Sequence, residues 1–291
     1  MRYLSQPATA LHLLFPALLS ATACSANREM PGTVAAAAGP PAVALTAVDY
    51  AFEAPDTVEA GVTTFRLLND GSQLHMAQLI KLEGGKSLDD FLVAYTEAFR
   101  TRGPRPPWAP RFGGPGTAEP GGSSNATQYL EPGSYAWICI MNVPDGIPHV
   151  VKTRMAKAFA VRARNGAPAP QTAPAASLVF QLVDYAFRIT GPLTAGPHVI
   201  RVENAGTEPH EVAFLRLTPG KTMADFQAWM QNPQDPPPGN SVGGVSSLAP
   251  RLQAYFEVDL TAGEYVILCF VTAPDGRSHT EHGMIQHVRI D

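Results

Sequence analysis

The chain has 291 residues, of which 45% are hydrophobic and 16% charged, and its formal net charge at pH 7 is −4. This length suffices for two ordinary domains with their own cores, and the mild negative charge without a basic run argues against nucleic acid as the main partner. The 25 glycines and 28 prolines exclude coiled-coil and polytopic membrane proteins, and three cysteines are too few for a disulfide scaffold.

Residues 1–24 are similar to a secretory signal peptide. The apolar stretch Ala10–Leu19 is too short to span a bilayer stably, and small residues follow it. Ala21–Ala23 fits the small-x-small rule for cleavage, while Cys24 directly afterwards resembles the acylated cysteine of a bacterial lipobox. Ordinary cleavage and lipidation at Cys24 therefore both stay open, and either one predicts a periplasmic or envelope location. Residues 25–43, rich in alanine and proline, are predicted to form a tether.

From residue 44 onward, short runs of β-branched and aromatic residues between turn signals predict strands. In the first half of the chain these are residues 44–52, 62–68, 75–82, 134–141 and 156–161. A helix is predicted to begin after Ser87, because Asp90 stands three residues later as in a capping box. Its apolar stripe consists of Leu88, Phe91, Leu92, Tyr95 and Phe99. Loops rich in proline and glycine are predicted at 103–122 and 232–244.

The whole unit then occurs a second time. The motif Val-Asp-Tyr-Ala-Phe at Val48–Phe52 recurs at Val183–Phe187, and the pattern Asn-x-Gly-x-x-x-His at Asn69–His75 recurs at Asn204–His210. The helix recurs as well, with the residues Thr222, Asp225, Phe226, Trp229 and Met230. The repetition therefore predicts two homologous domains.

We expect these domains to span residues 44–164 and 177–291, joined by a linker at 165–176 that is rich in proline and alanine. Short strands with turn signals and one inserted helix per unit predict an all-β chain of two tandem antiparallel β-sandwiches.

Each repeat contains one cysteine, at the same position of its fourth predicted strand. A histidine stands ten residues after the cysteine, a methionine follows five or six residues later, and another histidine comes directly after the Asn-x-Gly turn. The first set is His75, Cys139, His149 and Met155, and the second is His210, Cys269, His279 and Met284. Two imidazoles and one thiolate form a trigonal copper site, which a weak axial thioether completes.

Taken singly, each residue has a structural explanation, since a cysteine on an aromatic strand face is typical of an inert core thiol. Their occurrence in the same order in both repeats favours metal binding.

At these residues the sequence resembles the cupredoxins, the plastocyanin-like blue copper proteins. Asn204–His210 is similar to the turn that delivers the family's first histidine ligand, and Cys269, His279 and Met284 stand in the order of its later ligands. The resemblance covers both repeats and implies Greek-key β-sandwiches, type 1 copper and one-electron transfer. It implies at most one copper per domain. The set that begins with His75 would hold the copper of the first domain, and the set that begins with His210 would hold that of the second.

Two departures from the family pattern bear on the sites. Nine residues lie between cysteine and histidine, where small cupredoxins have two to four, although copper nitrite reductases have a comparably long loop. The first repeat has one extra residue between histidine and methionine, and Leu74 replaces the proline found at 209. The second domain is therefore the better candidate for copper. There, His282 lies between His279 and Met284 and is a further candidate ligand.

Three functions stay open: electron transfer to a redox partner protein of the envelope, a metal-free interaction or scaffold module, and copper storage or delivery. An enzyme is not expected, because a multicopper oxidase needs His-x-His pairs and a His-Cys-His triplet of neighbouring residues. Leu268 and Phe270 flank Cys269 instead. A catalytic copper like that of nitrite reductases would need spare histidines at a subunit interface, and only His282 and His287 are unassigned near the site. Membrane contact is expected only through a lipid anchor at Cys24.

Overall fold

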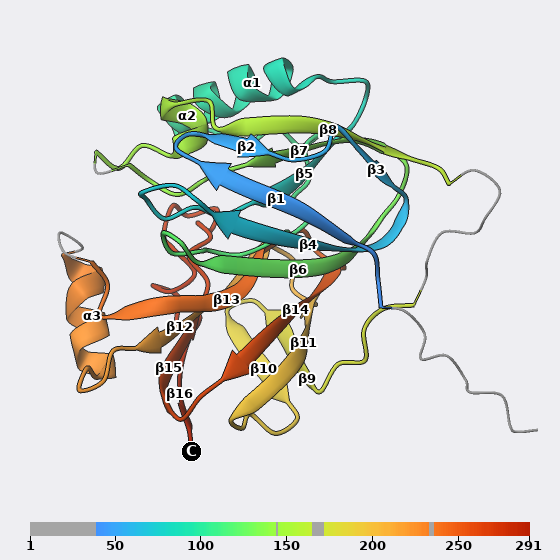
Figure 1. Ribbon diagram of the computed structural model, residues 1–291. Helices are drawn as coiled ribbons and strands as arrows, with labels where there is room; N and C mark the ends of the chain where they lie inside the picture. Colours follow the sequence, from blue (N-terminus) through green and yellow to red (C-terminus); the bar gives the residue numbers. More distant parts are fainter. Residues whose placement is uncertain (1–38, 144, 165–171, 233–235) are drawn as a thin grey trace, which may run out of the picture. The chain divides into compact units, whose positions relative to one another are not determined.

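The first repeat folds into two four-stranded layers with a core between them (Figure 1). The structure is a computed structural model that describes residues 39–143, 145–164, 172–232 and 236–291. One layer has the strand order β2-β1-β4-β6 and the other β3-β8-β7-β5. The strands are β1 (Ala42–Val48), β2 (Ala51–Glu53), β3 (Thr57–Glu59), β4 (Gly61–Asn69), β5 (Gln78–Leu82), β6 (Ser123–Leu130), β7 (Gly133–Ile138) and β8 (Ala156–Arg162).

The second repeat has the same two-layer arrangement, with strand orders β10-β9-β11-β14 and β13-β12-β15-β16. Its core contains Phe180, Phe214 and Phe256, which are fully buried. Its strands are β9 (Leu178–Val183), β10 (Ala186–Thr190), β11 (Gly196–Asn204), β12 (His210–Leu217), β13 (Gly239–Leu248), β14 (Gln253–Leu260), β15 (Gly263–Leu268) and β16 (Ile285–Ile290).

The expected strand at 44–52 is in fact two strands. The chain turns back after β1, so that Val48 pairs with Ala51, and Asp49 and Tyr50 form the turn. β1 runs parallel to β4, and β9 runs parallel to β11 in the second repeat, so the sandwiches are not purely antiparallel. Because β1 reaches β4 by a crossover, the turn at its end comes to lie beside residues that are distant in the sequence.

The two halves share a continuous sheet. β6 and β14 pair at Thr127 and Tyr255, which joins their layers into one eight-stranded sheet. Residues Gly39–Asp291 accordingly form one compact unit. The predicted signal peptide at 1–24, the candidate lipidation site Cys24 and most of the predicted tether lie outside the described residues. Across the part of the chain that is described, no helix is long and apolar enough to cross a membrane.

Both proline- and glycine-rich loops contain more β-structure than expected. The predicted loop at 232–244 ends early, because β13 starts at Gly239 and pairs with β12. In the loop at 103–122, residues of the segment 111–118 form single bridges to β5 on one side and to β13 on the other. This segment therefore connects the two repeats by backbone hydrogen bonds.

The inserted helices begin where the sequence predicts. α1 (Leu88–Thr101) and α3 (Met223–Gln231) have complete capping boxes, formed by Ser87 with Asp90 and by Thr222 with Asp225. Phe99 does not belong to the buried stripe of α1, since its side chain is 42% exposed. The buried side chains of this helix are Phe91, Leu92 and Tyr95, which all lie before its last turn. The first domain also has a second, unpredicted helix, α2 (His149–Lys152), so it does not contain only one.

Candidate metal centres

Three predicted ligands of the first domain converge in its interior. The Nδ1 atoms of His75 and His149 lie 3.2 Å apart, and Cys139 Sγ lies 3.6 Å from the first and 3.4 Å from the second. All three side chains are fully buried. They form one of the two groups of the described chain in which three histidine, cysteine or acidic side chains can hold a metal ion.

The second domain contains the same triangle. The Nδ1 atoms of His210 and His279 lie 2.9 Å apart, and Cys269 Sγ lies 3.3 Å from His279 Nδ1. These side chains are also fully buried, and they form the other group. The longer spacing and Leu74 of the first repeat therefore do not prevent its site from forming, and both domains contain a site.

Both triangles fit a metal ion with trigonal coordination. Metal–nitrogen bonds of about 2.0 Å and metal–sulfur bonds of about 2.3 Å, set at 120°, place the ligand atoms roughly 3.5–3.7 Å apart. The separations to sulfur, 3.3–3.6 Å, are at or slightly below this range, whereas the two Nδ1 atoms lie closer, at 3.2 Å in the first domain and 2.9 Å in the second, so the imidazoles must move apart by a few tenths of an ångström to admit the ion. Two imidazoles and one thiolate are the donor set of type 1 copper, since soft sulfur suits Cu(I) and imidazole suits both oxidation states. The residues present therefore fit copper in both domains.

The Asn-x-Gly turn delivers the first histidine of each site. Asn69 donates from Nδ2 to the carbonyls of Gln73 and Ala118, and its Oδ1 accepts from Gly71 N, which fixes the turn before His75. In the second repeat, Asn204 makes the same bonds to Glu208, Leu248 and Gly206. His75 forms a bridge to Ala118 before β5, whereas His210 is the first residue of β12.

Glycine is required at the third position of this turn. A Cβ atom on Gly71 would overlap Asp49 Oδ1 and lie 2.8 Å from His75 Nε2, and one on Gly206 would overlap Asp184 Oδ1 and lie 2.7 Å from His210 Nε2. Real Cβ atoms essentially never approach other atoms so closely. The spacing of the repeated pattern thus reflects contact between the turn and the histidine.

An aspartate holds each of these histidines, and sequence reasoning did not identify it as part of the site. Asp49 Oδ1 lies 2.6 Å from His75 Nε2, and Asp184 Oδ1 lies 2.5 Å from His210 Nε2. A carboxylate at Nε2 favours the proton on that nitrogen, which leaves the lone pair of Nδ1 directed at the other ligands. The signal was the repeated Val-Asp-Tyr-Ala-Phe motif, which places an aspartate at the same position in both repeats.

Hydrogen bonds keep both aspartates ionised. Burial acts to raise the pKa of Asp49, but hydrogen bonds from Ser72 and His75 outweigh it and lower the pKa to about 2. Burial likewise opposes the bonds that Thr207 and His210 make to Asp184, and its pKa also falls to about 2. Each site therefore has a fixed negative charge behind its first histidine.

The tyrosine of the same motif lies against the second histidine. The rings of Tyr50 and His149 meet edge to face with centroids 4.9 Å apart, and those of Tyr185 and His279 do so at 4.8 Å. The tyrosines therefore help to bury the second histidine of each site.

Backbone hydrogen bonds connect the cysteine, the second histidine and the methionine. Cys139, which directly follows β7, donates from N to the Met155 carbonyl, and Met155 N donates to the His149 carbonyl. Cys269, Met284 and His279 repeat the pattern. Both methionines are fully buried in the same clusters as the cysteines. An axial thioether remains a prediction.

The further candidate ligand His282 lies elsewhere. Its ring stacks on Tyr185 with centroids 4.5 Å apart, and its Nε2 lies 3.0 Å from Asp275 Oδ2. His287 pairs with Glu264, so neither histidine belongs to the group formed by His210, Cys269 and His279.

Without metal, both thiols are protonated and both second histidines are neutral at pH 7. Burial raises the pKa of Cys139 to about 12, and burial together with the charge of Glu211 raises the pKa of Cys269. Burial and the neighbouring His75 lower the pKa of His149 to about 4, and burial and His210 lower that of His279. A thiolate therefore forms only when a cation replaces its proton.

We expect the folded, metal-free protein to react very slowly with a disulfide reagent at pH 7. Thiolate is the reactive form, and both thiols of the mature domains are buried and protonated. With Cys24 replaced by serine, so that only the two domain thiols remain, absorbance of the released thiol should rise only as the protein unfolds in denaturant. Fast reaction of Cys139 or Cys269 in native buffer would contradict the closed site.

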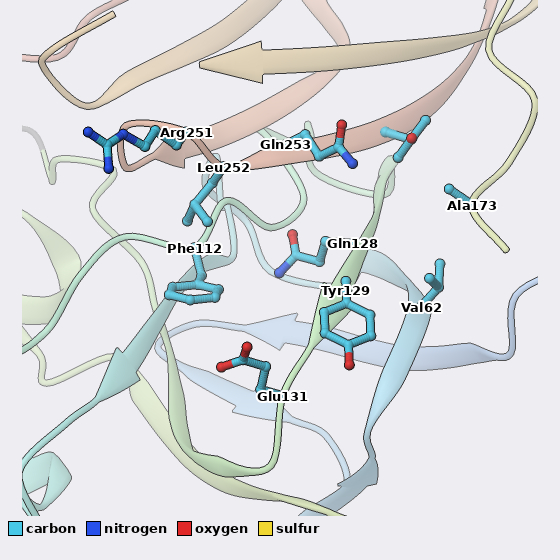
Figure 2. Close-up of a pocket in the computed structure, with 10 residues that line it drawn as sticks. Val62, Phe112, Gln128, Tyr129, Glu131, Ala173, Arg251, Leu252 and Gln253 are labelled. Atoms are coloured by element: carbon cyan, nitrogen blue, oxygen red, sulfur yellow. The ribbon is translucent and has the colours of Figure 1, made fainter. Parts of the chain in front are cut away.

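A cavity of about 400 Å³ lies apart from these groups (Figure 2). Phe112, Tyr129, Glu131 and Arg251 line it between the two repeats, and none of the eight predicted metal ligands does. The cavity therefore has no part in the metal sites.

Comparisons with known proteins return weak structural similarities. No protein-family model and no curated protein matches the chain. Auracyanin A, a "blue" copper protein from the green thermophilic photosynthetic bacterium Chloroflexus aurantiacus, is 19% identical over 43% of this chain and all of its own, with a TM-score of 0.31. The Blue Copper Oxidase from Nitrosomonas europaea is 15% identical over 86% of both chains, with a TM-score of 0.27.

A copper-containing nitrite reductase from Thermus scotoductus is 10% identical over 86% of this chain and 61% of its own, with a TM-score of 0.22. The fold assignment follows instead from the chain's own sheets and ligand groups. Two β-sandwiches, each with a buried His-Cys-His triangle behind an Asn-x-Gly turn, give this protein a two-domain cupredoxin-like fold with a copper-binding donor set in both domains.

Proposed function

We propose that the protein binds one copper ion in each domain and transfers single electrons. The observation that carries this proposal is the convergence of Nδ1, Sγ and Nδ1 within 3.6 Å in the first domain, with all three side chains fully buried. The second domain repeats the arrangement. Bound copper would supply a one-electron couple between Cu(II) and Cu(I).

The chain's own residues prepare the site for such a couple. The cysteine gives up its thiol proton, and the two imidazoles offer the Nδ1 lone pairs that the aspartate and the local packing direct inward. The Asn-x-Gly turn and the backbone bonds around the cysteine hold these atoms in place. A rigid, buried donor set lets the oxidation state change with little rearrangement.

Burial supports electron transfer rather than catalysis at the metal. A substrate that is converted at a metal needs an open coordination position. All six histidine and cysteine side chains of the two groups are fully buried, and tyrosines cover the second histidines. Electrons can still cross a thin protein layer, so we propose a carrier and not an enzyme.

The partner would be another redox protein, met through a small, transient contact. Phe270 directly follows Cys269 and is 44% exposed, which offers an apolar contact close to the second site. The signal-like start of the sequence supports export, with or without a lipid at Cys24. We therefore propose that this exchange takes place in the bacterial envelope.

Copper titration of the purified mature chain tests the proposal. We expect two copper ions per chain, intense visible absorption from thiolate-to-Cu(II) charge transfer, and reversible bleaching by a one-electron reductant. A colourless protein at full occupancy would rule out the proposed mechanism. Retention of no stoichiometric metal would indicate a scaffold module, and tight Cu(I) binding without reversible electrochemistry would indicate storage or delivery.

A further inference from the structure

The two sites differ at one carboxylate beside the second histidine. We propose that Glu208 lowers the reduction potential of the second site below that of the first, an inference that rests on the proposed copper function. The protein would then hold two unequal electron sites instead of two copies of one.

Glu208 contacts both the ligand and its covering tyrosine. Its Oε2 lies 3.1 Å from His279 Nε2, and its Oε1 accepts a hydrogen bond of 2.9 Å from the Tyr185 hydroxyl. The side chain is 21% exposed, while His279 is fully buried. Since His279 Nδ1 faces Cys269, a metal-bound ring carries its proton on Nε2 and donates a hydrogen bond from there to Glu208.

The first domain has an amide at the same place. Gln73 corresponds to Glu208 in the repeat, and its Nε2 donates to the Tyr50 hydroxyl. His149 Nε2 is buried and has no hydrogen-bond partner among the residues that the structure describes. The second histidine of this site therefore lacks the carboxylate that its counterpart contacts.

Apart from the ring of His282, which stacks on Tyr185 in the second domain, most other surroundings of the two second histidines match, which makes the repeats a natural comparison. Both sites have an aspartate on the first histidine and a tyrosine edge on the second, with ring separations that agree within 0.1 Å. Both place a Pro-Asp-Gly sequence in the loop between cysteine and histidine.

Glu211 is a second difference, because Met76 occupies its place in the first repeat. It contacts the cysteine rather than the second histidine: its backbone N donates to Cys269 Sγ, and its Oε1 accepts from Phe270 N. Burial raises the pKa of Glu211. Its contribution must therefore be measured separately from that of Glu208.

The direction of the effect follows from charge. A carboxylate that accepts a hydrogen bond from Nε2–H makes the imidazole a stronger donor to the metal, and its negative charge favours the copper ion of higher charge. Reduction adds one electron to Cu(II) to give Cu(I), with the electron coming from the reductant in the titration. Stabilising Cu(II) over Cu(I) lowers the potential of the second site.

Single-site proteins make the comparison direct. Cys139→Ser leaves only the second site and Cys269→Ser only the first, and redox titration with ferricyanide and ascorbate gives each potential. Glu208→Gln should lower the ratio of Cu(II) to Cu(I) affinity at the second site about tenfold. This change raises the potential of that site by ~59 mV for one electron. Gln73→Glu should lower the first potential in turn.

Two control variants isolate the contact. Glu264→Gln removes the same charge near the start of β15, where the carboxylate pairs with His287 and Arg289, and should leave the second potential unchanged. Glu211→Gln measures how much the carboxyl group of Glu211 contributes to the potential of the second site. Since Gln73 already pairs with Tyr50 in the same turn of the first domain, Glu208→Gln is expected to fold, and circular dichroism checks it.

A readout without copper completes the test. In the ¹⁵N NMR spectrum of the metal-free protein, Glu208→Gln should shift the ring nitrogens of His279 and leave those of His149 in place. Sites that bind copper with equal potentials, or a second potential that Glu208→Gln does not move, overturn the inference and leave the proposed function standing. If the single-site proteins bind no copper, the proposed function is wrong, and the inference about Glu208 fails with it.

Discussion

Replacement of Cys269 by serine is expected to abolish the visible absorption of the second domain and to leave that of the first. A hydroxyl does not supply the charge-transfer transition of a thiolate and is a far poorer ligand for copper. Cys269 is the only cysteine in its repeat and is fully buried, so no neighbouring thiol of that repeat can replace it. Optical titration with Cu(II) of Cys269→Ser against the unmodified protein measures the loss.

Cys139→Ser is the matched variant for the first domain, and its remaining spectrum should be that of the second. The double variant should bind copper weakly and without intense colour. The buried hydroxyl costs about 1–3 kcal/mol where it stays without a partner, so urea unfolding of the metal-free variants must accompany the spectra. Intense colour in the folded double variant would contradict the assignment of both thiolates.

Gly206→Ala is expected to weaken copper binding in the second domain by roughly 10–100-fold. The added methyl group would overlap Asp184 Oδ1 and lie 2.7 Å from His210 Nε2. The histidine and the aspartate that orients it cannot both keep their places. Competition titration with a chelator of known affinity, in the Cys139→Ser background, gives the change.

Gly71→Ala should produce the same loss in the first domain, because its Cβ would meet Asp49 and His75 in the same way. Gly39→Ala is the control, since a Cβ atom there meets nothing within 4 Å. Undiminished copper affinity in folded Gly206→Ala would show that the contact between turn and histidine does not govern the site.

Much of the architecture was predictable from repetition. Two copies of a pattern that differ at most other positions indicate which residues depend on each other, and the order His, Cys, His, Met carried the chemistry. Tyr135, Trp137 and Cys139 alternate along one strand and therefore share one face, and all three side chains lie in the same buried cluster. The capping boxes predicted the starts of α1 and α3 because they depend only on residues within four consecutive positions.

Predictions that depended on chain reversal or on pairing were less accurate. The strand expected at 44–52 reverses at Asp49 and Tyr50, and part of the loop expected at 232–244 belongs to β13. Local composition does not reveal these features, because a strand edge gains its hydrogen bonds from whichever segment the fold brings beside it.

The amino-acid sequence alone determined the duplication, the all-β class and which histidines and cysteines meet in the two candidate metal groups, because these depend on residue type and spacing. Only the tertiary structure decided which groups surround the ligands: an aspartate from the end of β1 or β9, a tyrosine over the second histidine, and Glu208 in one domain only. These contacts join residues that are more than twenty positions apart, and only the folding of the sandwich brings their side chains within hydrogen-bond distance.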